Sequence, residues 1–134
     1  MPSKGIRLNN PGNIEKGLNW SGLADVQNDS RFCTFTTPEY GIRAICKILG
    51  NYQTKHKIST IRGIINRWAP PSENKTDKYA ENVSEWSGFG IEDILDLKDR
   101  GTLLELTKAI SQQECGVVPW SDEVYSKGVN LAIG

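Results

Sequence analysis

Several features that mark specialised protein classes are scarce or missing in this sequence. The chain has three cysteines, an odd number without paired spacing, and a single histidine, His56. These counts argue against a disulfide framework, a zinc site and a cysteine–histidine nucleophile. No apolar run approaches the length of a membrane span, so we expect no membrane insertion. The first residues, Met1-Pro2-Ser3-Lys4, lack the apolar stretch of a signal peptide, and we expect none.

An excess of charge of either sign is also missing. The 134 residues include 16 Lys and Arg and 16 Asp and Glu, which gives a formal net charge of zero. A nucleic-acid-binding domain usually has a basic face, so nucleic acid is the weakest candidate partner. Basic residues gather only at Lys55-His56-Lys57, Arg62 and Arg67, and we interpret this cluster as a solvated turn and helix face.

The hydrophobic pattern predicts one mainly α-helical (α+β) domain over residues 1–134. Hydrophobic residues make up 37% of the chain, which is enough for a single core at this length. Residues 5–35 are rich in Gly and Asn, with short apolar alternations that predict loops and a small β-hairpin. Apolar residues then recur at helical spacing. We expect helices at about 37–54, 59–68, 74–88, 102–116 and 121–132, with a short turn or helix at 91–97.

Glu114 is the strongest candidate for chemistry. Thr102 and Glu105 have the spacing of a capping box, and Leu103 begins the apolar stripe of this helix. Glu114 lies eleven positions after Leu103 and therefore about 20° from it around the helix. A carboxyl withdrawn from water favours its protonated form, as a general acid for glycosidic cleavage requires. The alternative is a frayed helix end that leaves Glu114 exposed.

Other polar residues have both structural and functional interpretations. Glu39 has capping-box spacing from Thr36, a structural role that we favour on spacing alone. Glu73 lies in a loop between helices, where it either lines a cleft or is solvated. Residues 9–13 combine three asparagines with a Pro-Gly turn, so their amides bond the local backbone or face a ligand.

Several segments together resemble a family of small bacteriophage virion or prophage structural proteins. The similarity spans nearly the whole chain, and its segments occur in the expected order. They are residues 5–14 (GIRLNNPGNI), 31–35 (RFCTF), 38–44 (PEYGIRA), 66–74 (NRWAPPSEN) and 113–116 (QECG).

A weaker resemblance, to the lysozyme superfamily, implies a mechanism. The Asn turn, the segment from Phe35 to Glu39 and the segment from Trp68 to Tyr79 are similar in order to motifs of bacterial glucosaminidases. Residues 109–116 (AISQQECG) are similar to the helix end that carries the catalytic acid of lysozymes and lytic transglycosylases. Because the order of these motifs is reversed, the resemblance implies a circularly permuted lysozyme-like domain with Glu114 beside the Asn turn.

The resemblance also assigns roles to particular residues. It makes Glu114 the acid, with Glu73 or Glu39 as a second carboxylate if one is used. Asn10 and Asn13 would bind N-acetyl groups or position a water, and Tyr79 would stabilise developing positive charge or stack on a sugar. Two further residues of the matching segments, Asn74 and Arg43, join the expected substrate-binding set.

We therefore predict a lysozyme-like enzyme that cleaves peptidoglycan glycan strands as a muramidase, glucosaminidase or lytic transglycosylase, without cofactor or metal. The expected partners are glycan strands and other virion proteins. The expected location is the virion, the bacterial periplasm or the cell wall. The alternative function is a non-catalytic virion or tail protein that has a structural role or binds glycan.

Overall fold

The computed structural model describes residues 2–72 and 74–134, and its secondary structure is essentially all α-helical. Six helices are present in the described residues. They are α1 (Lys4–Arg7), α2 (Pro38–His56), α3 (Ile61–Trp68), α4 (Thr76–Ser87), α5 (Arg100–Cys115) and α6 (Asp122–Ile133).

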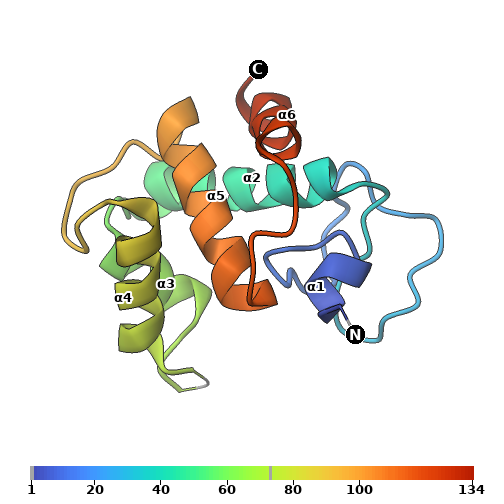
Figure 1. Cartoon of the computed structure of the whole chain (residues 1–134), viewed down its shortest axis with the longest axis horizontal. Coiled ribbons are helices and arrows are strands. Elements are labelled where there is room, and N and C mark those ends of the chain that lie inside the picture. Colours follow the sequence, from blue (N-terminus) through green and yellow to red (C-terminus); the bar gives the residue numbers. More distant parts are fainter. Residues whose placement is uncertain (1, 73) are drawn as a thin grey trace.

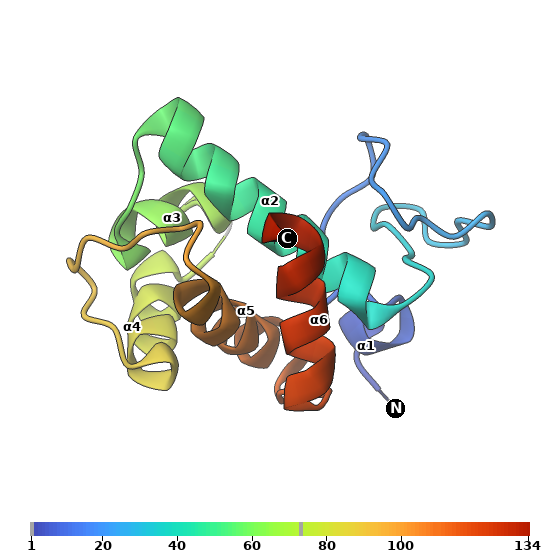
Figure 2. The same ribbon diagram turned by 90° about the horizontal axis from the view of Figure 1, so that it is seen from above.

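The long helix α2 lies at the centre of the arrangement (Figure 1). α6 packs across α2, α5 packs between α4 and α6, and α3 packs on α4. Seen from above, the α3–α4 pair lies at one end of the molecule and the N-terminal loops with α1 lie at the other (Figure 2). α5 therefore ends between these two parts of the fold.

One continuous apolar core holds the helices together. Every helix from α2 to α6 contributes to it, and the apolar stripes predicted from the sequence supply most of its members. Its fully buried large side chains include Ile42, Ile45, Leu49, Ile61, Ile64, Ile65, Leu103, Leu106, Ile110 and Tyr125.

The N-terminal region forms no regular strand within the described residues. The predicted hairpin is reduced to two isolated antiparallel bridges, Glu15 with Phe32 and Leu23 with Phe35. α1, which the sequence analysis placed in a loop, is a single turn and therefore too short to show a helical period.

Most of the predicted helices agree with the structure to within a few residues, but their starts need two corrections. At α2 the N-cap residue is Thr37 and no side chain caps the helix, because the Thr36 hydroxyl donates to the Gly22 carbonyl instead. The predicted capping pair of Thr36 with Glu39 is therefore wrong. At α5 the helix begins earlier than predicted, and the Asp99 carboxylate accepts from the Thr102 amide.

Two local features complete the helical part of the fold. Thr60 caps α3, accepting from the Gly63 amide at 3.1 Å. Residues 91–97, for which a short turn or helix was predicted, contain turns and no helix. Their backbone bonds to the start of α3 instead, with the Leu95 amide donating to the Ser59 carbonyl and the Ile91 carbonyl accepting from Arg62.

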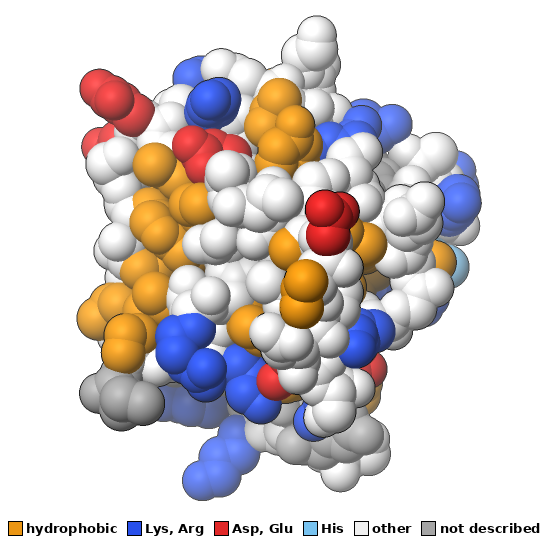
Figure 3. Space-filling model, turned by 90° about the vertical axis from the view of Figure 1, so that its right-hand side faces the viewer, with side chains coloured by type: hydrophobic (Ala, Val, Ile, Leu, Met, Phe, Trp, Pro, Cys, Tyr) orange, Lys and Arg blue, Asp and Glu red, His pale blue; other side chains and the backbone are white. Residues whose placement is uncertain are grey.

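The surface carries charges of both signs. Figure 3 shows the side with α1 and the N-terminal loops, where basic and acidic side chains are interspersed with apolar and uncharged ones. Among the helices that the structure describes, none combines the length and the apolar character needed to cross a bilayer.

Candidate active site

Glu114 lies in the last turn of α5, where two side chains from distant segments bind its carboxylate. Asn13 Nδ2 donates to Glu114 Oε1 at 2.7 Å, and Tyr79 Oη donates to Oε2 at 2.7 Å. Gly116, at φ 82°, ends the helix directly afterwards. The carboxylate is thus held in one orientation by a loop from the start of the chain and by α4.

Tyr79 belongs to α4 and is only 5% exposed. Burial raises the pKa of its phenol well above 10, and the negative charge of Glu114 raises it further. The phenol therefore stays protonated at neutral pH and keeps donating to Glu114. A second link, from Asn82 Nδ2 to Gln113 Oε1 at 3.0 Å, joins the same two helices beside this contact.

Asn13 reaches Glu114 because the preceding turn is fixed internally. Its own backbone has φ 50°, a left-handed conformation that asparagine tolerates better than most residues. Asn10 is fully buried, and its Nδ2 donates to the carbonyls of Ile14 and Cys33 at 3.0 and 2.9 Å. Asn10 Oδ1 also accepts from the Ile14 amide. Asn10 therefore holds the turn in place and does not face a ligand, contrary to the predicted substrate-binding role.

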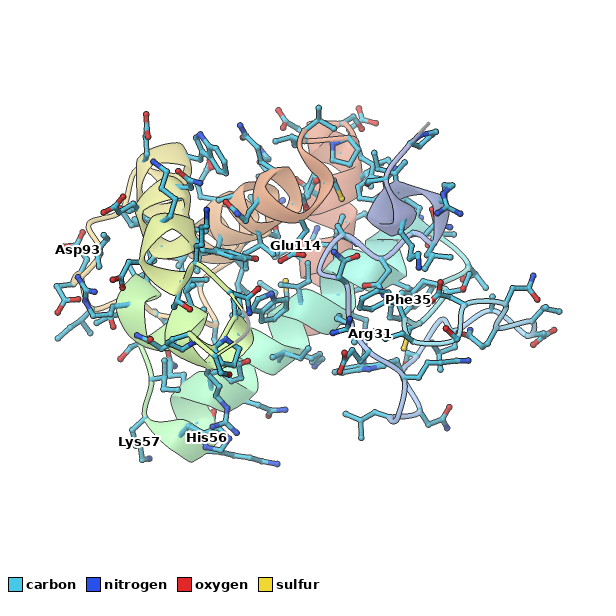
Figure 4. The ribbon with its side chains drawn as sticks, turned by 90° about the horizontal axis from the view of Figure 1, so that it is seen from below. Arg31, Phe35, His56, Lys57, Asp93 and Glu114 are labelled. Carbon is cyan, nitrogen blue, oxygen red and sulfur yellow. The ribbon has the colours of Figure 1, made fainter. Side chains whose placement is uncertain are left out.

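A groove of about 660 Å³ opens beside Glu114. Figure 4 shows Glu114 near the middle of the molecule, between the α3–α4 side and the N-terminal loops, with Arg31 on the loop side. One wall comes from these loops and includes Asn13, Ile14, Arg31 and Phe32. The opposite wall comes from α2, from the last residue of α3 and from the segment after it, and includes Ile48, Tyr52, Trp68, Pro70 and Asn74.

The other predicted site residues are divided between this groove and the rest of the fold. Asn74 lines the groove, with its Nδ2 donating to the Pro70 carbonyl at 3.2 Å. Glu39 and Arg43 lie in the first turns of α2 and are not among the described residues that line the groove. Glu73 lies outside the described residues.

Three aromatic residues of the groove were not singled out as ligand-binding by the sequence analysis. Trp68 is only partly buried and lines the groove. Tyr52 lies in α2, and Phe32 lies in the N-terminal loops. The position of Trp68 in the sequence could have indicated this role. It ends a short helix directly before Ala69 and Pro70, where a side chain borders a loop.

A second carboxylate, Glu15, also lines the groove. It is exposed and forms an ion pair with Arg31, which lies over the Phe32 ring at 4.9 Å from its centroid. The neighbouring thiol of Cys115 has a pKa raised mainly by burial, so it stays protonated and is a poor nucleophile at neutral pH. In the described part of the chain, His, Cys, Asp and Glu side chains form no group of three suited to a metal ion.

The comparison with known proteins identifies a bacteriophage relative. The chain is 36% identical over 130 residues to Protein P5 of Pseudoalteromonas phage PM2, and the match covers 94% of this chain and 79% of that protein. The chain belongs to the family of phage protein P5. No protein-family model matches it. The P5 relationship confirms the expectation of a bacteriophage protein.

Proposed function

We propose that this P5-family protein cleaves the glycan strands of peptidoglycan, with Glu114 as the general acid. The observation that carries the proposal is the carboxyl group of Glu114, which lines an open groove and is bound through both oxygens by side chains from other segments. Cleavage of a glycosidic bond requires a carboxyl group that is positioned to protonate the leaving oxygen.

The contacts of Glu114 suit a positioned acid–base group. Both partners are neutral side chains that donate one hydrogen bond each, so the carboxyl group is oriented by hydrogen bonds from two segments. Proton transfer to the glycosidic oxygen leaves the carboxylate ionised, and in that form it accepts from Asn13 and Tyr79. These two hydrogen bonds then strengthen as the C1–O bond breaks, because bonds to a charged acceptor are stronger.

The described residues favour a route with one carboxylate. Glu15 is engaged with Arg31, and Glu39 does not line the groove. In this route Glu114 first protonates the leaving oxygen and then accepts the proton of the muramic 6-hydroxyl as O6 bonds to C1. The product is a 1,6-anhydro end, as in lytic transglycosylases. Hydrolysis is the other route, in which an activated water attacks C1 and leaves a reducing end.

The walls of the groove suit a glycan. Trp68 supplies aromatic surface for stacking of a sugar ring, and Asn74 supplies an amide for hydroxyl or N-acetyl groups. The juxtaposition of the Asn turn with Glu114, 101 positions apart in the chain, supports the permuted lysozyme-like arrangement that the sequence resemblance implies. A phage protein of this kind acts on the cell wall from the virion or the periplasm.

The test is mass spectrometry of fragments released from purified sacculi by the wild-type protein and by Glu114→Gln. Gln keeps the size of Glu114 and still accepts from Asn13, but it cannot donate an acidic proton. Glu105→Gln, on the same helix, is the matched control. We expect the wild type and Glu105→Gln to release fragments and Glu114→Gln to release none. The chemistry of the new ends then distinguishes the transglycosylase from the muramidase and glucosaminidase routes.

Two results would overturn the proposal. Equal release by Glu114→Gln would remove Glu114 as the acid. No release by any folded protein, over several peptidoglycan types, would favour the non-catalytic virion or glycan-binding role.

A further inference from the structure

The groove beside Glu114 continues into a second hollow toward the C-terminal end of α2. This hollow has a volume of about 640 Å³ and shares Tyr52 and Pro70 with the Glu114 groove. Its other walls come from the connection before α3 and from α3 itself, and include Ile58, Asn66 and Arg67. Because the two hollows share Tyr52 and Pro70, a linear polymer that extends along the groove past Tyr52 reaches the second hollow.

Arg67 is the charged side chain among the described residues that line this hollow. Its guanidinium lies over the Tyr52 ring, 5.6 Å from the centroid. A cation held on an aromatic face has fewer accessible rotamers, so less freedom is lost when it binds a ligand. The ring thus presents Arg67 in a fixed place at the junction of the two hollows.

Arg67 is not neutralised by an ion pair within the described part of the chain. The same holds for Lys55 and Lys57, at the end of α2. Figure 4 shows His56 and Lys57 at this end of the molecule, away from the N-terminal loops. Arg62, on the same helix as Arg67, differs because it is paired with Glu92 and Asp77.

We propose that the second hollow is a subsite for a carboxylate carried by the glycan strand, with Arg67 as its binding residue. This inference rests on the proposed function. A guanidinium binds a planar carboxylate through two parallel hydrogen bonds, which suits the free carboxyl groups of the peptides that muramic acid carries. The subsite would favour peptide-bearing strands over neutral polysaccharides and would set the position of the strand relative to Glu114.

The test measures binding of the Glu114→Gln protein to purified sacculi, so that no cleavage occurs during the assay. Arg67→Ala and the control Arg62→Ala are each added to this background. Each protein is measured on untreated sacculi and on sacculi whose carboxyl groups have been converted to amides with carbodiimide and ammonia. Because Arg67 is exposed, its removal leaves the core intact, and circular dichroism checks the fold.

We expect Arg67→Ala to weaken binding to untreated sacculi by about threefold to tenfold relative to the Glu114→Gln parent protein. Amidation of the sacculi should weaken binding of the parent protein by a similar factor. Amidated sacculi should bind the parent and Arg67→Ala alike, whereas Arg62→Ala should behave as the parent on both. Equal binding of the parent and Arg67→Ala to untreated sacculi would overturn the subsite, as would an equal loss in Arg62→Ala.

The two proposals fail separately. If the wild type releases no fragments but binding still depends on Arg67 and on free carboxyl groups, cleavage is refuted and the subsite stands as a glycan-binding site. If the wild type cleaves but binding is indifferent to Arg67, cleavage stands and the subsite is refuted.

Discussion

Substitution of Tyr79 by Phe tests the contact that orients Glu114. The change removes one hydroxyl, which donates to Glu114 Oε2 at 2.7 Å, and keeps the buried ring. A hydrogen bond to a charged group contributes about 1.5–3 kcal/mol, and water reaches the partly exposed Glu114 carboxylate to replace some of it. We therefore expect Tyr79→Phe to lower the free energy of unfolding by about 1–2 kcal/mol at pH 7.

A double-mutant cycle with Glu114→Gln isolates the interaction. In Glu114→Gln the one amide oxygen accepts from Asn13 and the amide NH2 faces Tyr79 Oη, so the cycle reports the loss of the charged acceptor of the Tyr79 hydroxyl. Urea unfolding of the four proteins, followed by tryptophan fluorescence, should give a coupling energy of about 1 kcal/mol. Effects that add to within about 0.3 kcal/mol would show that the charge of Glu114 does not strengthen its contact with Tyr79 in solution.

The stability of the wild type and of Tyr79→Phe at alkaline pH checks the burial of Tyr79. In the folded protein the pKa of this phenol lies well above 10, whereas in the unfolded chain the phenol releases its proton near pH 10. The wild type therefore loses stability relative to Tyr79→Phe above pH 10, by up to about 1.4 kcal/mol per pH unit. The two stabilities should converge near pH 11. Tyr125, whose pKa burial raises to about 12, is present in both proteins and cancels. A constant difference from pH 9 to pH 11 would refute the reasoning.

Three further predictions concern the scaffold around the groove. Backbone amides of residues 31 and 32 lower the pKa of Asp29 to about 2, so its stabilisation holds above about pH 4 and is lost toward pH 2. Unfolding curves of wild type and Asp29→Asn should converge over that window, and a constant gap would contradict this. Burial raises the pKa of Cys46 to about 12, so iodoacetamide should modify it at least about tenfold more slowly in the native than in the unfolded protein, measured by mass spectrometry. A Cβ at Gly41 would lie 2.1 Å from the Asn9 carbonyl oxygen, so Gly41→Ala should lower stability by about 2–3 kcal/mol. Gly50→Ala should not, because its Cβ would be in ordinary contact with the Lys98 side chain at 3.9 Å.

The helices could be predicted from the sequence because each one buries a stripe at its own period. Ile61, Ile64 and Ile65 share a face in the sequence and are all buried. The first residues of the helices were less predictable, because a side chain that could cap a helix can also bond to other backbone groups. The Thr36 hydroxyl has the spacing to cap α2 but bonds a loop carbonyl, a partner that only the tertiary fold supplies.

The candidate site was predictable in its centre and not in its walls. The helical period placed Glu114 on the inner face of α5, and the family resemblance added Asn13 and Tyr79. Asn10 and Asn13 have the same residue type three positions apart, yet one is fully buried and the other faces Glu114. Their difference arises from the turn geometry, since the side chain that lies inside the turn must satisfy buried carbonyls.

The close approach of the chain's first turn to the end of α5 explains how Asn13 reaches Glu114. A Cβ at Gly5 of α1 would lie 2.9 Å from Cys115 Sγ, 3.0 Å from the Asn10 carbonyl oxygen and 3.4 Å from Asn13 Oδ1. A side chain at residue 5 would push these groups apart by a few tenths of an ångström, so glycine lets α1, the Asn turn and the last turn of α5 meet closely at this point. The carboxylate is thereby held by a turn that also forms one wall of the groove. The same packing that completes the fold at this end therefore orients the group that we propose to carry the chemistry.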